Sequence, residues 1–145
     1  MIAANELRIG NWFQQDASNN NAISRFFTVD EIKRYGVRST YIRQDTNQPH
    51  TSLFSLDSIH PIPLTPEILE KCGFEKVENP KQYGWYISVG NRELCWCHAD
   101  YISLEFKVGQ LDDFCDTIKD IDCKYLHQLQ NLYFALCGEE LNYTP

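Results

Sequence analysis

The run Cys95-Trp96-Cys97-His98 contains the side chains of this chain that are best suited to bind a metal ion. Structural zinc sites use thiolate sulfur and imidazole nitrogen as ligands. On a β-strand, however, Cys95 and Cys97 would face one side of the sheet and His98 the other. The run also lacks the spacing and the second ligand pair of a typical zinc site. We therefore expect two buried cysteines and no metal, and Cys95, Cys97 and His98 remain the alternative zinc ligands.

Cysteine and histidine can also form a nucleophile and its base, and the chain contains six cysteines and four histidines. Such catalysis needs a partly exposed thiolate, an adjacent base and a group that orients the base. No spacing in the sequence selects one pair over another. The chain also contains no serine nucleophile elbow and no phosphate-binding glycine loop. We expect no catalytic residue and no cofactor, and a thiol or zinc enzyme remains a third alternative for function.

A third set of polar residues lies within the amphipathic segment 123–137. Its apolar side chains recur at three- and four-residue spacing and form one stripe on a helix: Leu126, Leu129, Leu132, Tyr133 and Leu136. His127, Asn131 and Phe134 then share a neighbouring flank, and Gln130 lies at its border. Uncharged donors and acceptors beside an aromatic ring suit a protein partner or a small polar ligand. In the structural alternative, His127 and Asn131 bond to the backbone of the N-terminal half.

Aromatic residues are frequent in both halves of the chain. Consecutive pairs such as Trp12-Phe13 and Trp85-Tyr86 must point one ring to each side of a strand. If the outer rings are not covered by the rest of the chain, they form an exposed patch, which usually marks an interface. The sequence therefore favours a protein partner or a homodimer.

The composition disfavours several other classes of partner. The chain has 13 Lys and Arg, 20 Asp and Glu and a net charge of −7. Nucleic-acid binding depends on basic residues that neutralise phosphates, so direct nucleic-acid binding is not expected. No apolar run approaches the roughly 18 residues of a membrane span, and the N-terminal residues do not have the pattern of a signal peptide. We expect a soluble, cytoplasmic protein without a membrane partner and with reduced thiols.

The first half of the chain, residues 1–63, reads as β-rich. Short segments rich in β-branched and aromatic residues at 7–13, 24–32, 35–43 and 51–59 alternate with polar turns. This pattern predicts either a small SH3-like β-barrel or a curled antiparallel sheet. The prolines of Pro61-Ile62-Pro63 cannot donate to a sheet and mark the end of this half.

The second half, residues 64–145, is predicted as a helix, a β-meander and a final helix. Thr65 is placed as the N-cap of a short helix at 66–72, which ends at Gly73. Strands are expected at 74–78, 85–89, 93–98 and 102–108. Residues 110–123 have helical spacing but an Asp-rich composition, so their conformation stays open. With the C-terminal helix at 123–137, the chain is of α+β class, and we expect both halves to pack as one unit.

Three stretches, NELRIGNWF (5–13), IHPIPLTPEILEKCGF (59–74) and YLHQLQNLYFALCGEEL (125–141), occur in this order. Together they resemble a family of small proteins found in Bacteroides-type bacteria and in their phages and mobile elements. The resemblance spans the chain, although the intervening strands match only in pattern. It implies a phage or mobile-element context and assigns no activity and no site residue.

These observations lead to one main functional hypothesis and its alternatives. The main hypothesis is a non-enzymatic accessory protein that binds a protein partner, or a second copy of itself, in bacterial cytoplasm. The first alternative is a protein that sequesters a nucleotide signal and so acts against host defence. It would use basic side chains, of which Arg25, Arg38, Arg43 and Arg92 are available without clustering in the sequence.

Overall fold

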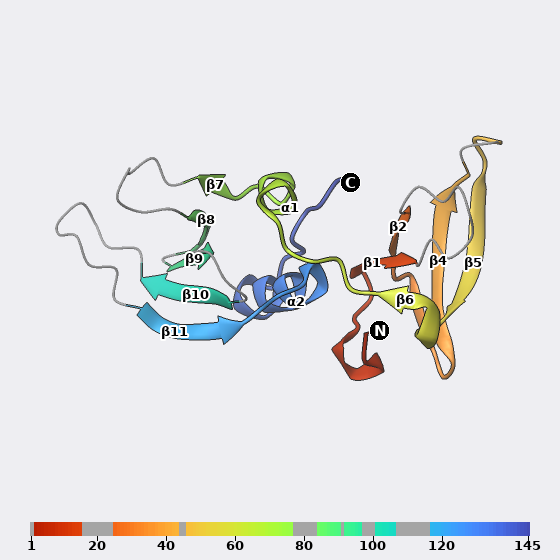
Figure 1. The fold of residues 1–145 in the computed structure, drawn as a ribbon, viewed down its shortest axis with the longest axis horizontal. Helices are drawn as coiled ribbons and strands as arrows, with labels where there is room; N and C mark the ends of the chain where they lie inside the picture. Colours follow the sequence, from red (N-terminus) through yellow and green to blue (C-terminus); the bar gives the residue numbers. More distant parts are fainter. Residues whose placement is uncertain are drawn as a thin grey trace. The chain divides into compact units, whose positions relative to one another are not determined.

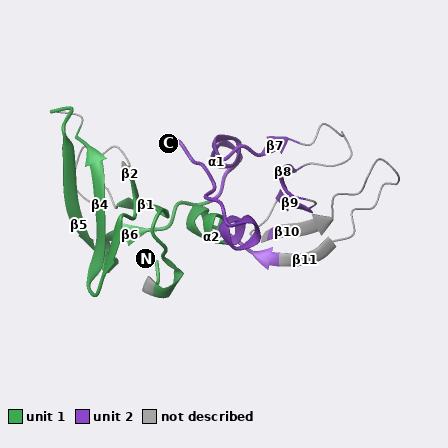
Figure 2. Cartoon of the chain, turned by 180° about the vertical axis from the view of Figure 1, so that it is seen from behind, with its two compact units in different colours: residues 1–63, 125–131 green, residues 64–124, 132–145 purple. Residues whose placement is uncertain are grey.

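The computed structural model describes residues 2–15, 25–43, 46–76, 84–90, 92–96, 101–106 and 117–145. The chain divides into two compact units, which Figure 2 shows in different colours. Unit 1 combines residues 1–63 with 125–131, and unit 2 combines residues 64–124 with 132–145. The described elements are antiparallel strands, two α-helices and two short 3-10 helices, which confirms the predicted α+β class.

Unit 1 contains two three-stranded antiparallel sheets, ordered β2-β1-β6 and β3-β4-β5 (Figure 1). The strands are β1 (Trp12–Gln15), β2 (Arg25–Thr28), β3 (Glu31–Lys33), β4 (Gly36–Ile42), β5 (Pro49–Ser55) and β6 (Ile59–His60). The 3-10 helix η1 (Ala4–Glu6) comes before β1, and η2 (Leu56–Ser58) comes before β6. The described strands do not close into a barrel, so unit 1 shows two separate small sheets in place of the closed form.

The segment predicted as one strand at 24–32 is divided between the two sheets. β2 pairs with β1 and β3 pairs with β4, and Asp30 lies between them. The Asp30 N–H donates to the Arg38 carbonyl at 2.9 Å, and the Asp30 carboxylate accepts the Thr40 N–H at 2.5 Å. These bonds attach Asp30 to β4, so the chain changes sheets at this residue.

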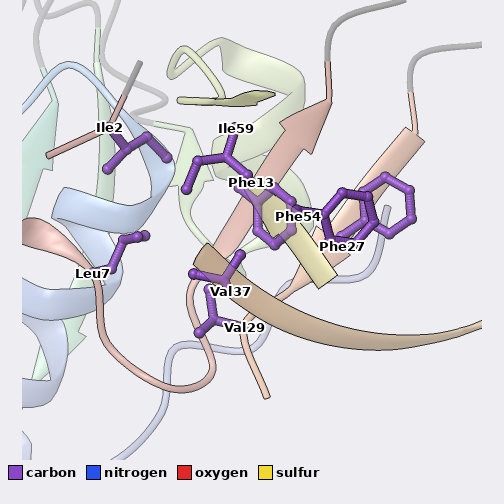
Figure 3. Packing of buried hydrophobic residues seen from close by; sticks show 8 residues of the cluster. All are labelled: Ile2, Leu7, Phe13, Phe27, Val29, Val37, Phe54 and Ile59. Atoms are coloured by element: carbon purple, nitrogen blue, oxygen red, sulfur yellow. The ribbon is translucent and has the colours of Figure 1, made fainter. Parts of the chain in front are cut away.

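The core of unit 1 lies between its two sheets. Figure 3 shows its buried side chains: Ile2, Leu7, Phe13, Phe27, Val29, Val37, Phe54 and Ile59. The rings of Phe13 and Phe27 come from the β2-β1-β6 sheet, and both contact the ring of Phe54 on β5, with centroids 5.4 Å and 4.7 Å apart. Burial of each such side chain stabilises the fold by roughly 1.5–3 kcal/mol. The aromatic contacts therefore hold the two sheets together.

Unit 2 contains a five-stranded antiparallel sheet, ordered β11-β10-β9-β8-β7. Its strands are β7 (Glu75–Lys76), β8 (Trp85–Val89), β9 (Arg92–Trp96), β10 (Tyr101–Phe106) and β11 (Thr117–Asp122). Residues 117–122, whose conformation the sequence left open, therefore form a strand. The partner strand explains this choice, because Ile121 lies opposite Ile102 on β10 and the two strands pair along β11 with one register shift between Lys119 and Thr117.

The short helix α1 (Pro66–Lys71) agrees with its prediction. The Thr65 hydroxyl accepts the Ile68 N–H at 3.3 Å and so caps the first turn, with proline at the first helical position. Gly73 has a φ of 85°, which a helix end often requires and which glycine adopts without strain.

The C-terminal helix α2 (Leu126–Cys137) begins later than the predicted start at residue 123. Its residues up to 131 belong to unit 1, and the others belong to unit 2. The helix ends at Gly138, whose N–H donates to the Phe134 carbonyl at 2.8 Å and whose φ is 75°. Among the described residues, no helix combines the length and apolar character that crossing a membrane requires.

Candidate protein-binding surface

The structure places the residues predicted as a binding flank of α2 in different surroundings. His127 and Gln130 are buried, with 1% and 2% of their surface exposed. Asn131 is half-buried, and these three residues belong to unit 1. Phe134 is 38% exposed and belongs to unit 2. Only Phe134 therefore presents the open surface that the binding hypothesis needed.

Gln130 bonds to the backbone of the segment that leads into β1. Its Oε1 accepts the Trp12 N–H at 2.9 Å, and its Nε2 donates to the Gly10 carbonyl at 3.3 Å. A primary amide offers a donor and an acceptor side by side, as a peptide group does. The Gln130 amide thus occupies the position that a neighbouring strand would take beside residues 10–12.

Asn131 connects α2 to the N-terminal loop through three groups. Its Nδ2 donates to the Glu6 carbonyl at 2.8 Å, and its Oδ1 accepts from Asn11 Nδ2 at 2.9 Å and from Arg8 Nε at 3.3 Å. Asn11 is fully buried, and its Oδ1 accepts the Arg8 N–H at 2.7 Å. These contacts match the structural alternative for Asn131, in which α2 holds the backbone of the N-terminal half.

His127 is the buried group without a hydrogen bond in this region. Its ring lies parallel to that of Tyr125, with centroids 5.9 Å apart, and its Nε2 is 3.6 Å from the Glu6 carboxylate. Neither ring nitrogen has a hydrogen-bond partner among the described residues. Burial lowers the pKa of His127, and the Glu6 carboxylate opposes this shift. His127 does not bond to the backbone as the structural alternative proposed.

The cysteines for which the structure gives an environment differ in reactivity. Burial raises the pKa of Cys72 and of Cys123 to about 12, with the charge of Asp122 adding to the effect at Cys123. Cys95 is half-buried and Cys137 is exposed. The other two members of the zinc hypothesis, Cys97 and His98, lie outside the described residues. In the described part of the chain, no three His, Cys, Asp or Glu side chains lie close enough to hold a metal ion.

The β3-β4-β5 sheet has a second face, which points away from the core of unit 1. Along β4 and β5 the side chains alternate, so Val37 and Phe54 face the core while their neighbours face outward. Cross-strand pairing places these outward side chains together: Arg38 with Leu53, Thr40 with Thr51, and Ile42 with Pro49. We call these six residues the outer face. Leu53 is 64% exposed and Ile42 is 58% exposed.

Charged residues lie at the β3 end of the same sheet. Glu31 forms salt bridges with Lys33 and, at 2.9 Å, with Arg38. The hydrogen bond from Lys33 and the charge of Arg38 lower the pKa of Glu31. In the adjoining turn, Tyr35 is 72% exposed, and the Arg34 guanidinium lies 5.1 Å from its ring centroid. The outer face therefore combines the apolar residues Ile42, Pro49 and Leu53 with two threonines and Arg38, and it has a charged border toward β3.

β5 is the outermost strand of this sheet (Figure 1). It pairs with β4 along all seven of its residues, and no other described strand pairs with it. Its sequence, PHTSLFS, contains no charged residue. A strand of this kind presents unpaired backbone groups along its outer edge, next to the exposed side chain of Leu53.

Sequence reasoning did not select Ile42 and Leu53. Ile42 directly follows Tyr41, and Leu53 directly precedes Phe54. Two adjacent large apolar residues on a strand must point to opposite sides, so one of each pair had to face outward. The signal was thus present, but the sequence alone does not say which member of the pair is buried.

The chain was also compared with known proteins. No protein-family model, curated protein or solved structure matches it.

Proposed function

We propose that this chain is a non-enzymatic accessory protein that binds a protein partner through the outer face of the β3-β4-β5 sheet. The observation that carries the proposal is the exposure of Leu53 and Ile42 on one face of a regular sheet. Isolated exposed apolar residues are common, but two on one face beside an unpaired strand edge favour an interface.

The organisation of unit 1 supports this proposal. Its two sheets use their inner faces for a common core, so the outer face is free to bind without loss of that core. We also propose that unit 1 has an SH3-like character without a closed barrel, since SH3 domains bind peptide partners on their surface. The phage or mobile-element context and the bacterial cytoplasm rest on the family resemblance.

The charged border of the outer face suggests how a partner would be selected. Lys33, Arg34 and Arg38 outnumber Asp30 and Glu31 at this end of the sheet, so it keeps an excess of one positive charge. An acidic group on the partner would gain from this charge, while apolar side chains would cover Leu53 and Ile42. Leu53 and Ile42, once covered by the partner, would supply affinity, and the exposed charges would mainly affect the association rate.

Affinity capture from a bacterial host tests the proposal, with Ile42→Ser as the variant and Ile9→Ser as the matched control. Both isoleucines are 58% exposed, but Ile9 lies in the turn before β1 and not on the outer face. We expect a partner whose dissociation constant, measured with purified proteins, rises at least about tenfold with Ile42→Ser, a loss of about 1.4 kcal/mol. Ile9→Ser should leave it unchanged.

Two results would contradict the proposal. One is a partner that binds both variants with the affinity of the unmodified chain, because its site would then lie elsewhere. The other is a large thermal stabilisation by a nucleotide in the absence of any protein partner. That result would favour the nucleotide-sequestering alternative.

A further inference from the structure

The outer edge of β5 is the least protected part of the described β-structure of unit 1. Natural sheets usually block their edges with charged residues, prolines, bulges or short strands, and of these features β5 has only Pro49, at its first position. β5 has seven residues, none of them charged, and it pairs with β4 in an unbroken register from Gly36↔Ser55 to Ile42↔Pro49. It therefore combines length, regularity and neutrality, the properties that favour the addition of another strand.

A second copy of the same strand is chemically compatible with this edge. Two copies of β5 related by a two-fold axis run antiparallel, so each contact occurs twice. Because the strand contains no Asp, Glu, Lys or Arg, no like charges meet across the axis. The exposed Leu53 side chain of each copy would lie on a face shared by six strands, where its neighbours cover part of its surface.

The distribution of charge indicates which part of the chain two copies would share. Unit 1 contains six Lys and Arg and six Asp and Glu, whereas unit 2 contains seven and fourteen. Unit 1 is thus neutral, and unit 2 carries the whole net charge of −7. Two copies that meet through unit 2 would repel one another, and two copies that meet through unit 1 would not. Charge therefore favours self-association at unit 1.

We propose that two copies of this chain associate through antiparallel pairing of their β5 strands, which forms one continuous sheet ordered β3-β4-β5-β5-β4-β3. This inference goes beyond the proposed function by naming a second copy as a partner of the β5 edge, next to the outer face. The backbone groups of β5 provide the hydrogen bonds, and Leu53 and Thr51 provide the side-chain contacts next to the axis.

The test measures the molecular mass of three purified proteins by light scattering over a series of concentrations. They are the unmodified chain and two lysine variants. The unmodified chain should form a dimer. Leu53→Lys puts a charge on the edge strand and should raise the dimer dissociation constant at least about tenfold. Ile9→Lys is the matched control, because it adds the same charge at a similarly exposed apolar position of unit 1 that does not belong to the outer face. It should leave the dimer intact.

The sign of the charge change makes the test specific. Lysine lowers the net negative charge of each copy, so general repulsion between copies would weaken in both variants. A dimer lost only with Leu53→Lys must then depend on the β5 edge. Hydrogen exchange should also show slower exchange of the β5 amides in the unmodified dimer than in the Leu53→Lys variant.

A monomer at every concentration would overturn the inference, and so would a dimer that survives Leu53→Lys. Loss of the dimer in both variants would also overturn it, since the loss would then not depend on the β5 edge. In each case the binding experiment with Ile42→Ser tests the proposed function separately. If a different protein binds through the outer face, the proposed function still holds. Far-ultraviolet circular dichroism verifies that all variants are folded.

Discussion

Gln130 and Asn131 show how two neighbouring side chains can link distant parts of a chain. Their partners lie at residues 6–12, which are 118 to 125 residues away in the sequence. The Gln130 amide makes two part-buried hydrogen bonds to backbone groups, and the loss of such a bond costs about 1–3 kcal/mol. These contacts assign the two residues to the stability of unit 1.

We therefore expect Gln130→Ala to lower the free energy of unfolding by about 2–4 kcal/mol, because it removes the hydrogen bonds to the Trp12 N–H and to the Gly10 carbonyl. Chemical denaturation monitored by circular dichroism measures the change. Asn142→Ala, at an exposed position of the C-terminal tail, is the control and should have an effect below about 0.5 kcal/mol. Equal stability of both variants would contradict the structural role of Gln130.

His127 makes stability depend on pH. Its folded pKa is lowered from 6.5, so the unfolded chain binds a proton as the pH falls through about 6.5 while the folded chain still excludes it. The free energy of unfolding should therefore decrease below about pH 6.5, by at most about 1.4 kcal/mol per unit for this group. Denaturation curves between pH 7.5 and pH 5 measure this dependence.

The control for this prediction replaces the titrating ring. His127→Phe keeps an aromatic ring beside Tyr125 and should remove the decrease in the free energy of unfolding on acidification. His50→Phe, at an exposed position on β5, should retain this decrease. The prediction fails if His127→Phe shows the same loss of stability on acidification as the unmodified chain.

Burial also predicts which cysteines react with thiol reagents. At pH 8, a pKa of about 12 leaves Cys72 and Cys123 almost entirely protonated, and the thiolate is the reactive form. Labelling of the native chain followed by mass spectrometry should therefore modify the exposed Cys137 well before these two. After unfolding in denaturant, Cys72 and Cys123 should react at the rate of Cys137. Rapid native labelling of Cys72 would show that its surroundings are open.

At the scale of elements, the β4-β5 pair holds the candidate surface in place. Its inner side chains Val37 and Phe54 are part of the unit 1 core, and its outer side chains form the outer face. The close approach of the two strands depends on Gly36, because a Cβ atom built there would lie 2.1 Å from the Phe54 carbonyl oxygen. Backbone atoms cannot move aside without breaking the sheet register.

Gly36→Ala should therefore lower the free energy of unfolding by at least about 3 kcal/mol and abolish binding through the outer face. Arg38→Ala is the control on the same strand. It removes an exposed salt bridge with Glu31 and should change stability by no more than about 1 kcal/mol. Thermal unfolding distinguishes the two, and similar melting temperatures would contradict the predicted clash.

At the scale of the whole molecule, unit 1 is discontinuous in sequence. Residues 125–131 complete it, and Leu126 and Leu129 of this segment are fully buried. Deletion of one such leucine side chain typically costs about 2–5 kcal/mol, while whole domains are stable by only about 5–15 kcal/mol. Unit 1 therefore depends on a segment close to the C-terminus.

A fragment of residues 1–63 should accordingly fail to unfold cooperatively, because it lacks these leucines and the Gln130 amide. Amide chemical-shift dispersion in a nuclear magnetic resonance spectrum and the shape of the denaturation curve measure this. The full-length chain carrying Leu129→Ala provides the intermediate case, with a loss of about 2–5 kcal/mol but a cooperative transition. A well-dispersed spectrum of the isolated fragment would show that unit 1 does not need residues 125–131.

The sequence by itself determined the elements whose signals are local. Thr65, Pro66 and Gly73 delimit a helix through interactions within one turn, and the β-branched and aromatic residues of 35–43 predict a strand. The α+β class follows from such segments. Packing of the two halves as one unit, the homodimer and the family resemblance stay predictions.

Only the tertiary structure decided what the polar flank of α2 does and which apolar residues remain exposed. Helical periodicity places His127, Gln130 and Asn131 beside the leucine stripe but cannot show that residues 6–12 cover them. Likewise, Ile42 and Leu53 look like core residues until the pairing of β4 with β5 turns them outward. The physical reason is the same in both cases: burial depends on contacts between residues far apart in the chain, and local spacing carries no information about those partners.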